Sequence, residues 1–258
     1  MTTAKEARGE SLWETVKTII YALALAMCIR FVFVQPFRIP SGSMQPTLLV
    51  GDYMVVSKWS YGYSRFSVEP FNFGWPAGRI FGHEPQRGDV VVFRPVPQED
   101  KDLVKRLIGL PGDKIQYKDS QLYINGTQVQ RTSEGIVHFK DFISDGNGHT
   151  VGFNYIDVQA YRETLPNGVS YLTFDRDPNG ALDKTDVFEV PPGNYFFMGD
   201  DRDNSADSRT SQVGYVPFEN LVGKAQFVFV SFDPLISLLK PWTIFTGFRG
   251  DRVVHHVN

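Results

Sequence analysis

The sequence predicts a mainly β protein, in which an N-terminal transmembrane helix is followed by a β-rich domain of antiparallel sheets with a smaller β sub-domain inserted into it. Two observations lead to this fold class: a single apolar run near the N-terminus, and many short runs of β-forming residues separated by Gly, Pro and Asn-Gly turns. With 258 residues and 42% hydrophobic content, the chain is long and apolar enough to bury a sizeable core.

The apolar run covers residues 18–34, in which Arg30 is the only charged residue. The three residues that follow extend it to the ~20 residues that a membrane-spanning helix needs. Pro36 is expected to end the helix, because proline lacks the backbone N–H that a helix interior requires. We therefore expect a single-pass anchor over residues 18–36.

Basic residues flank this run unequally. Three precede it and one follows it closely, namely Lys5, Arg8 and Lys17 against Arg38. Since positive charge is retained on the cytoplasmic side, residues 1–17 are predicted to be cytoplasmic and the rest of the chain to lie outside. A cleaved signal peptide is the alternative, with the small residues 24–26 as its cleavage site. The apolar run continues well beyond that site, which favours an uncleaved anchor.

The exported part divides into a core and an insertion. The main expected strands cover residues 52–59, 90–93, 102–110, 195–198 and 224–232. Residues 114–117 and 121–129 are expected to be short strands, the latter folded about Asn125-Gly126. Four further Gly-containing turn pairs punctuate the polar stretch that follows. We therefore expect residues 37–117 and 191–258 to form the core, and residues 118–190 to form a sub-domain of small strands.

Residues 60–86 combine aromatic side chains with several Gly and Pro residues. The aromatic residues are Tyr61, Tyr63, Phe66, Phe71, Phe73, Trp75 and Phe81. The stretch is too broken for a core helix. Two interpretations remain open: a long loop folded on its own aromatic side chains, or an amphipathic lip in contact with membrane lipid, where Trp and Tyr are favoured.

The composition excludes several classes of function. A net charge of -3 and a pI near 6.0, without a recognisable nucleic-acid-binding motif, argue against a nucleic-acid partner. The one cysteine, Cys28, lies in the apolar run, so an intramolecular disulfide is excluded. The five histidines have no metal-ligand spacing, and we expect neither a metal site nor a cofactor.

Two serines, Ser41 and Ser43, lie directly after the apolar run in the segment 37–48. Pro40 and Pro46 bracket them and a glycine separates them, so neither a helix nor a regular strand can continue through the segment. Such an irregular segment suits a reactive group, although a tight turn would explain it equally well. A serine hydroxyl also needs a base elsewhere in the chain to take its proton.

Lys105 is the candidate base. It is flanked by apolar residues and followed by Arg106, within an expected strand. Because neighbouring side chains in a strand point to opposite faces, one of the two cations is driven inward if the other faces outward. Burial among apolar groups lowers the pKa of a lysine toward the range of a useful base. The alternative is an ordinary strand at whose edge the ammonium group reaches solvent.

An acidic loop covers residues 199–209 and alternates Asp with Arg. A calcium-binding EF-hand would need a glycine and a closing glutamate at fixed places, and both are missing. Arg202 and Arg209 are instead expected to pair with the neighbouring acids and to make the loop rigid. A solvated loop is the alternative.

Four motifs occur in a fixed order behind the anchor: PSGSMQPTL, RGDVVVF, KRLIGLPGD and GDDRDNSADSR. Together they resemble the bacterial type I signal peptidases (leader peptidases), serine proteases with a Ser/Lys dyad. The resemblance implies that Ser43 is the nucleophile, that neutral Lys105 is the general base, and that Ser41 and the backbone N–H of Ser43 form the oxyanion hole. It further implies that Ser205 orients the lysine amine and that Asp200, Asp207 and Arg209 are supporting charges.

The resemblance also implies a substrate and a location. The partners would be signal peptides of exported preproteins, cut after small residues at the outer, periplasmic side of the bacterial cytoplasmic membrane. The residues expected to line the substrate pockets are Phe37, Ile39, Met44, Leu48 and Val104. An extended peptide would pair its backbone with a strand edge. This chain has one span where some family members have two, and it lacks the cysteine pair that some relatives carry.

The sequence leaves three alternatives. A mitochondrial inner-membrane relative would keep the same chemistry. A Ser-Lys self-cleaving repressor would need an N-terminal DNA-binding domain, which residues 1–35 cannot form. A membrane-anchored β-rich binding or scaffolding protein would use the two serines only as a turn.

Overall fold

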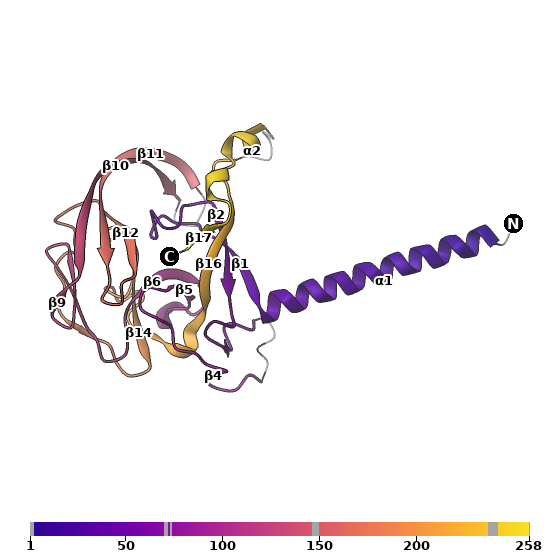
Figure 1. The fold of residues 1–258 in the computed structure, drawn as a ribbon, viewed down its shortest axis with the longest axis horizontal. Coiled ribbons are helices and arrows are strands. Elements are labelled where there is room, and N and C mark those ends of the chain that lie inside the picture. The colour runs from indigo at the N-terminus through magenta and orange to yellow at the C-terminus, as the bar shows by residue number, and fades with distance from the viewer. Residues whose placement is uncertain (1–2, 70–71, 73, 146–149, 237–241, 258) are drawn as a thin grey trace.

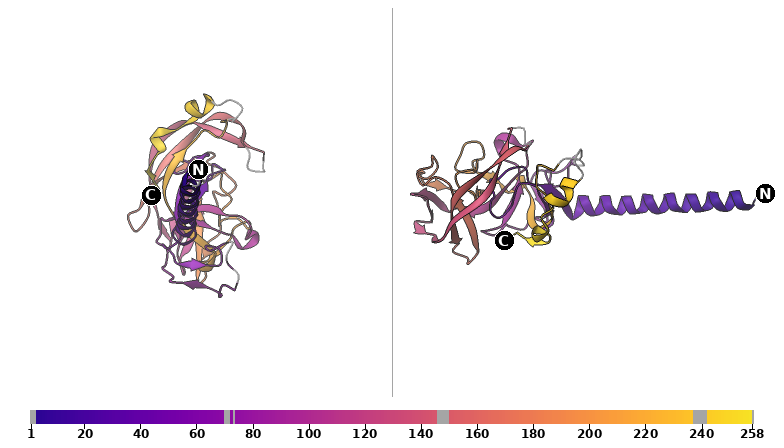
Figure 2. Two further views of the ribbon diagram at one scale, coloured as in Figure 1. Left: turned by 90° about the vertical axis from the view of Figure 1, so that its right-hand side faces the viewer. Right: turned by 90° about the horizontal axis from the view of Figure 1, so that it is seen from above.

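The structure, a computed structural model, describes residues 3–69, 72, 74–145, 150–236 and 242–257. One long N-terminal helix precedes a domain built from antiparallel β-sheets, as the sequence predicts. Figures 1 and 2 show the helix projecting away from this domain. Phe71 and Phe73, named above among the aromatic residues, lie outside the described residues.

Helix α1 (Thr3–Val32) is long and apolar enough over Leu12–Arg30 to cross a membrane. The apolar side chains of this stretch are exposed, and no part of it is buried against the described protein. The helix ends at Val32, four residues before the expected Pro36. Strand β1 (Val34–Arg38) begins there instead, and it tolerates Pro36 because it lies at the edge of its sheet.

The largest sheet follows the order β1-β2-β16-β5-β6-β14-β15, with β17 beside β16. Its further strands are β2 (Asp52–Ser57), β5 (Val90–Phe93), β6 (Leu103–Gly109), β14 (Asn194–Met198), β15 (Val216–Pro217), β16 (Leu221–Ser231) and β17 (His255–His256). All the neighbouring pairs are antiparallel. Every residue of β5 is buried: the strand lies between β16 and β6, and its side chains pack alternately into two hydrophobic clusters.

The insertion differs from its expectation. Strands β10 (Gln130–Ser144), β11 (Thr150–Thr164) and β12 (Ser170–Asp175) form one sheet, whose first two strands make a long hairpin rather than small strands. A second small sheet contains β7 (Lys114–Lys118), β8 (Gln121–Ile124), β9 (Thr127–Gln128) and β13 (Phe188–Glu189). Residues 114–117, expected in the core, therefore belong to this second sheet. The turn at Asn125-Gly126 is confirmed, with φ values of 54° and 78°.

The remaining segments are short. Strands β3 (Tyr63–Ser64) and β4 (Arg79–Ile80) pair within the aromatic stretch. Tyr61 and Phe66 of that stretch are buried in the core, whereas Phe81 is exposed. Helix α2 (Trp242–Gly247) and the 3₁₀ turns η1 (Val96–Gln98), η2 (Phe218–Asn220) and η3 (Gly250–Arg252) complete the described elements.

Two loops are held together by this framework. The first joins β1 to β2 and carries Ser41 and Ser43. The second follows β14 and carries the acidic motif. Backbone hydrogen bonds close the ends of the first loop, since Ile39 N–H donates to Asp52 O (2.8 Å) and Gly51 N–H to Ile39 O (2.9 Å). Three of its side chains fill the core beneath it: Ile39, Met44 and Leu48.

Candidate active site

Ser43 lies in a tight turn of the first loop. Gln45 N–H donates to Gly42 O (2.9 Å) and Leu48 N–H donates to Met44 O (2.9 Å), which coils the segment after the serine. The side chains of Met44 and Leu48 are fully buried, so the core anchors the turn on the far side of the serine. Ser43 itself is 8% exposed. Its hydroxyl is thus held in a fixed place with limited access to water.

Lys105 reaches this hydroxyl from β6. Its Nζ lies 2.5 Å from Ser43 Oγ, although 62 residues separate the two in sequence. The lysine is 4% exposed, and burial lowers its pKa to about 8 against the opposing effect of Asp207 and Asp200. Its ammonium form also donates to Val104 O at 3.1 Å. The amine can therefore lose its proton near neutral pH while it touches the serine.

The two other serines named from the sequence also lie at this site. Ser41 is exposed, and its Oγ lies 3.5 Å from Ser43 Oγ. Ser205 is buried, and its Oγ has no hydrogen-bond partner among the described residues, so no bond to Lys105 is present. Ser205 packs against Gly199, where an added Cβ would lie 2.2 Å from Ser205 Oγ and 2.5 Å from Ser43 O. Only glycine at position 199 permits this close approach.

Arg106, the neighbour of Lys105, is also fully buried, so the pair does not divide into one inward and one outward side chain. The reason is that β6 has protein on both faces and Arg106 lies over the ring of Tyr171, 3.9 Å from its centre. Its guanidinium binds Asp200 with two hydrogen bonds, of 2.8 and 2.7 Å. Asp200 also accepts a 2.5 Å hydrogen bond from Thr47 Oγ1, which joins it to the serine loop.

Asp207 and Arg209 form a second buried ion pair beside the lysine. Arg209 Nε and Nη2 each bind an Asp207 oxygen at 2.9 Å, and Gly199 N–H donates to the same carboxylate at 3.0 Å. Burial alone would raise the pKa of Asp207, but the Arg209 guanidinium holds that pKa below its usual range. Arg209 also donates to Arg202 O (2.6 Å), so the acidic loop is internally braced, as the sequence predicts.

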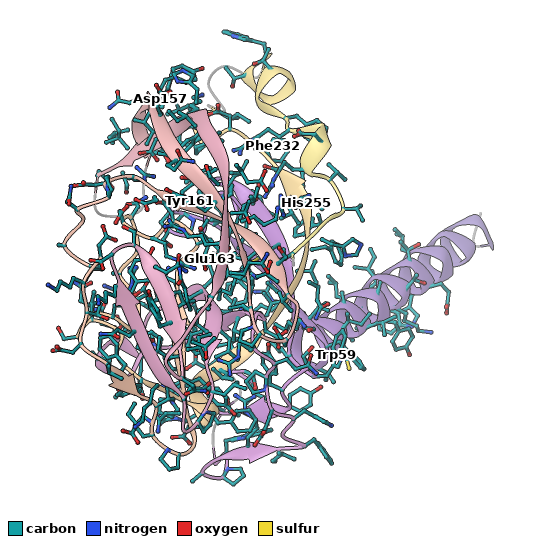
Figure 3. The ribbon with its side chains drawn as sticks, turned by 60° about the vertical axis from the view of Figure 1, so that its left-hand side comes forward. Trp59, Asp157, Tyr161, Glu163, Phe232 and His255 are labelled. Carbon is teal, nitrogen blue, oxygen red and sulfur yellow. The ribbon has the colours of Figure 1, made fainter. Side chains whose placement is uncertain are left out.

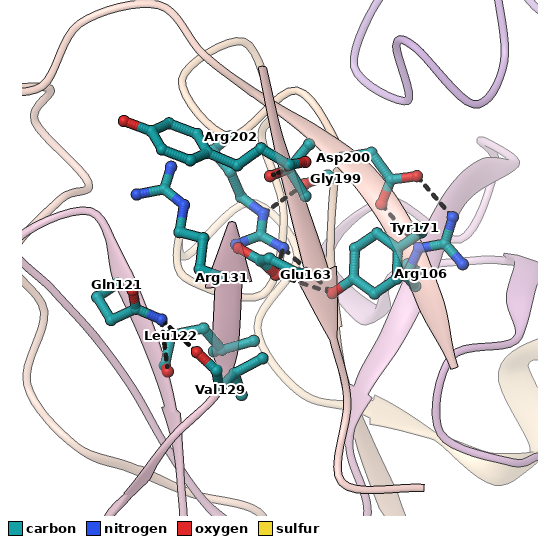
Figure 4. Close-up of polar contacts among 12 residues, drawn as sticks. Arg106, Gln121, Leu122, Val129, Arg131, Glu163, Tyr171, Gly199, Asp200 and Arg202 are labelled. Atoms are coloured by element: carbon teal, nitrogen blue, oxygen red, sulfur yellow. Dashed lines mark hydrogen bonds and ion pairs between the residues drawn. The ribbon is translucent and has the colours of Figure 1, made fainter. Parts of the chain in front are cut away.

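The side chain of Arg202 instead pairs with a residue outside its own loop. It binds Glu163 of β11 through two hydrogen bonds of 2.8 and 2.6 Å, and Tyr171 Oη donates to the same carboxylate at 3.0 Å. Figure 4 shows this cluster beside the pair of Arg106 and Asp200, and Figure 3 places Glu163 within the side chains of the insertion. Sequence reasoning missed Arg106, Glu163 and Tyr171. For Arg106, its position next to Lys105 in an otherwise apolar strand was the available signal.

The five residues expected to line substrate pockets belong to one cluster. Ile39, Met44 and Leu48 are core residues of it, and Phe37 and Val104 are partly buried against its edge. Beside them, β14 pairs only with Arg106, Leu107 and Gly109 of β6. In the described part of the chain, the side of residues 103–105 that faces away from β5 therefore has no partner strand.

Comparison with known proteins identifies the family. The model of a family described as signal peptidase, peptidase S26, matches residues 12–230. The chain belongs to this signal peptidase family. It is 42% identical over 243 residues to the signal peptidase I of Rickettsia massiliae (strain Mtu5), covering 87% of this chain and 86% of that protein. With the signal peptidase I of Rickettsia akari (strain Hartford) it shares 42% identity over 240 residues, which is 86% of this chain and 85% of that one.

A crystal structure of a signal peptidase I from Enterococcus faecalis V583 also matches, with 28% identity, 55% of this chain and 97% of that chain covered, and a TM-score of 0.30. The family assignment makes the protein a serine endopeptidase of signal-peptide processing and decides against a non-catalytic binding or scaffolding protein. In the described ranges, no group of three or more His, Cys, Asp or Glu side chains could hold a metal ion.

Proposed function

We propose that this peptidase removes N-terminal signal peptides from exported preproteins, with Ser43 as nucleophile and neutral Lys105 as general base. The observation that carries the proposal is the 2.5 Å contact between Lys105 Nζ and Ser43 Oγ inside a buried site. With a pKa of about 8, about one tenth of the Lys105 side chains are in the neutral amine form at pH 7. An unpaired, desolvated lysine is what a Ser-Lys variant of the catalytic triad needs.

The reaction would take two steps. Ser43 Oγ attacks the scissile carbonyl carbon while its proton passes to Lys105 Nζ, and that proton then goes to the leaving amine as the C–N bond breaks. A water molecule then attacks the resulting ester and gives a proton to Lys105 Nζ. Lys105 passes that proton to Ser43 Oγ as the C–O bond breaks, so the carboxylic acid product leaves and both residues return to their starting states. The oxyanion formed in both steps would accept hydrogen bonds from Ser43 N–H and Ser41 Oγ, which lies close to the nucleophile.

The open edge of β6 supports binding of the substrate as an extended strand. Backbone pairing at residues 103–105 would carry the peptide past Lys105. Phe37 and Val104 would then face its side chains over a filled core of Ile39, Met44 and Leu48. Because these positions leave little depth, small residues before the cut site are favoured. Ser205 would orient the lysine amine once substrate has closed the site.

Membrane attachment is part of the proposal. Helix α1 exposes its apolar side chains on all described turns, which suits lipid rather than water. Lys17 lies over the ring of Trp13 at 5.5 Å, a pair suited to an interface. At the other end, Phe33 and Trp59 form an exposed edge-to-face pair, 6.1 Å between ring centres. We propose a cytoplasmic N-terminus, a span in the bacterial cytoplasmic membrane and a catalytic domain on its outer face.

Only some residues of the aromatic stretch (60–86) are placed to contact lipid in this proposal. Tyr63 Oη donates to Val32 O (2.6 Å), which ties the stretch to the end of α1. Exposed Phe81 and Ile80 are the candidates for lipid contact, whereas Tyr61 and Phe66 belong to the core.

Substitution of the two dyad residues tests the proposal. Ser43→Ala and Lys105→Met are each expected to lower kcat at least about 10³-fold on a preprotein, because each removes an indispensable half of the same proton transfer. The full-length protein in detergent is incubated with the precursor and the cut is mapped by mass spectrometry. Exposed Ser133→Ala and Lys118→Met are the matched controls and should cut normally. Normal turnover by either dyad variant would show that the assigned mechanism is wrong.

A further inference from the structure

Asp201 holds the main chain of the nucleophile. Its backbone N–H donates to Ser43 O at 3.2 Å, a direct hydrogen bond from the acidic loop to the serine itself. On either side of it the loop is pinned to the end of β12, since Phe174 N–H donates to Asp200 O (2.9 Å) and Arg202 N–H to Phe174 O (3.0 Å). The position of Ser43 therefore depends on where Asp201 lies.

The carboxylate of Asp201 is fully buried, and Arg176 is its cationic partner. Arg176 Nε lies 3.0 Å from both carboxylate oxygens, and Nη2 donates to Oδ2 at 2.6 Å. Asn204 Nδ2 adds a longer bond to the same oxygen, at 3.4 Å. Burial raises the pKa of Asp201 to about 6 even with Arg176 opposing the shift. Without the guanidinium, this carboxylate would be left without a counter-charge in a desolvated place.

Arg176 is in turn held by the long hairpin. Its Nη1 and Nη2 bind the two oxygens of Asp141 in β10, at 2.7 and 3.1 Å. The preceding residue of β10, Lys140, pairs with Asp233 after β16 at 2.5 Å. The hairpin is thus fixed to the large sheet and, through Arg176, to the loop that contacts Ser43. A planar guanidinium with two bidentate partners transmits position as well as charge.

We propose that Arg176 is a positioning residue for the peptidase reaction, acting through Asp201 on the main chain of Ser43. The inference rests on Ser43 being the nucleophile. Arg176 touches neither the serine nor the lysine. It keeps Asp201 in place, so that Ser43 Oγ and N–H keep the geometry needed for attack and for oxyanion binding. The inserted sub-domain would then set the catalytic rate and not only support the fold.

Kinetics of Arg176 variants in the full-length detergent-solubilised protein test this role. Arg176→Met is expected to lower kcat by about 10- to 100-fold with KM changed less than about twofold, because displacements near 1 Å carry losses of this order. Arg176→Lys keeps the charge and should recover part of the loss. The control is Arg162→Met, which breaks the exposed pair with Glu134 (2.6 Å) on the same hairpin and should leave kcat unchanged.

A double-variant comparison separates positioning from general damage to the fold. Asp201→Asn keeps the side-chain shape and the backbone N–H, and by itself should lower kcat less than Arg176→Met. If Arg176 acts through Asp201, the losses are not additive: the double variant has a kcat equal to or higher than that of Arg176→Met, because no uncompensated carboxylate remains. Fully additive losses would overturn the proposal. An unchanged kcat in Arg176→Met, with Ser43→Ala inactive, would also overturn it. Turnover by Ser43→Ala would instead refute the proposed nucleophile.

Discussion

Two neighbouring cations on β6 have opposite environments. Lys105 is buried with its Nζ against a neutral hydroxyl, and burial lowers its pKa to about 8. Arg106 is buried against the Asp200 carboxylate, and although burial opposes this, that contact raises the pKa of the guanidinium above its usual value. Equal burial therefore yields a base in one case and a permanent ion pair in the other. The difference is the presence of a directly bound anion, which suits Arg106 to a structural role and leaves Lys105 suited to the proposed role of general base.

The largest expected effect comes from breaking the buried ion pair of Arg106 and Asp200. Arg106→Met leaves Asp200 buried without its partner and should lower the free energy of unfolding by about 3–5 kcal/mol. The double variant Arg106→Met/Asp200→Leu should recover most of this loss, since no uncompensated charge remains. Urea unfolding of the full-length protein in detergent measures both.

The exposed pair of Arg162 and Glu134 provides the comparison for this prediction. Arg162→Met should change the free energy of unfolding by less than about 1 kcal/mol, because both partners are solvated. Equal losses for the buried and the exposed pair would mean that Arg106 contributes no more than a surface charge.

The second expected effect concerns Lys105 and the pH dependence of the reaction rate. In the proposed mechanism only neutral Lys105 can accept the serine proton, so kcat/KM should fall about tenfold for each pH unit below the lysine pKa of about 8. The rate at pH 6 should thus be about one hundredth of its high-pH limit. A pH–rate profile with a preprotein measures the acidic limb. A limb near the ordinary lysine pKa of 10.5 would contradict the burial of this amine.

The sequence predicted this contrast only in part. The apolar neighbours of Lys105 and the irregular segment around Ser43 indicated a buried base and a reactive serine, because both signals are local. Alternation along a strand predicted that Lys105 and Arg106 point to opposite faces, so that one of them is driven inward if the other faces outward. The structure buries Arg106 as well, since Tyr171, 65 positions further along the chain, covers its face of the strand. The residues next to Arg106 in sequence carry no signal that so distant a side chain will bury it.

The long hairpin was missed for a related reason. Strands β10 and β11 expose side chains on both faces over much of their length, so they lack the regular polar and apolar alternation of a half-buried strand. Arg176 could not be recognised either, because its two carboxylate partners lie 25 and 35 residues away. The helix was expected to continue to Pro36 because Phe33 and Val34 prolong the apolar run and proline is a usual helix stop. It ends at Val32 instead, because residues 34–36 pair with β2.

The smallest expected effect is a gain in stability when the base is removed. A lysine whose folded pKa lies below its unfolded value binds fewer protons in the native state between about pH 8 and pH 10.5, so stability rises with pH across that window. Below it, the native protein carries the full cost of a buried charge. Lys105→Met has similar volume and no charge, and should raise the free energy of unfolding at pH 7 by about 1–2 kcal/mol, after the lost contact with Ser43 is subtracted.

The same variant at high pH completes this argument. At pH 10 most of the charge cost has gone from the wild-type protein, so the advantage of Lys105→Met should shrink toward zero. Urea unfolding of both proteins at pH 7 and pH 10 measures the difference. A variant that is destabilised equally at both pH values would show that Lys105 is held by packing rather than opposed by burial, and the contrast with Arg106 would disappear.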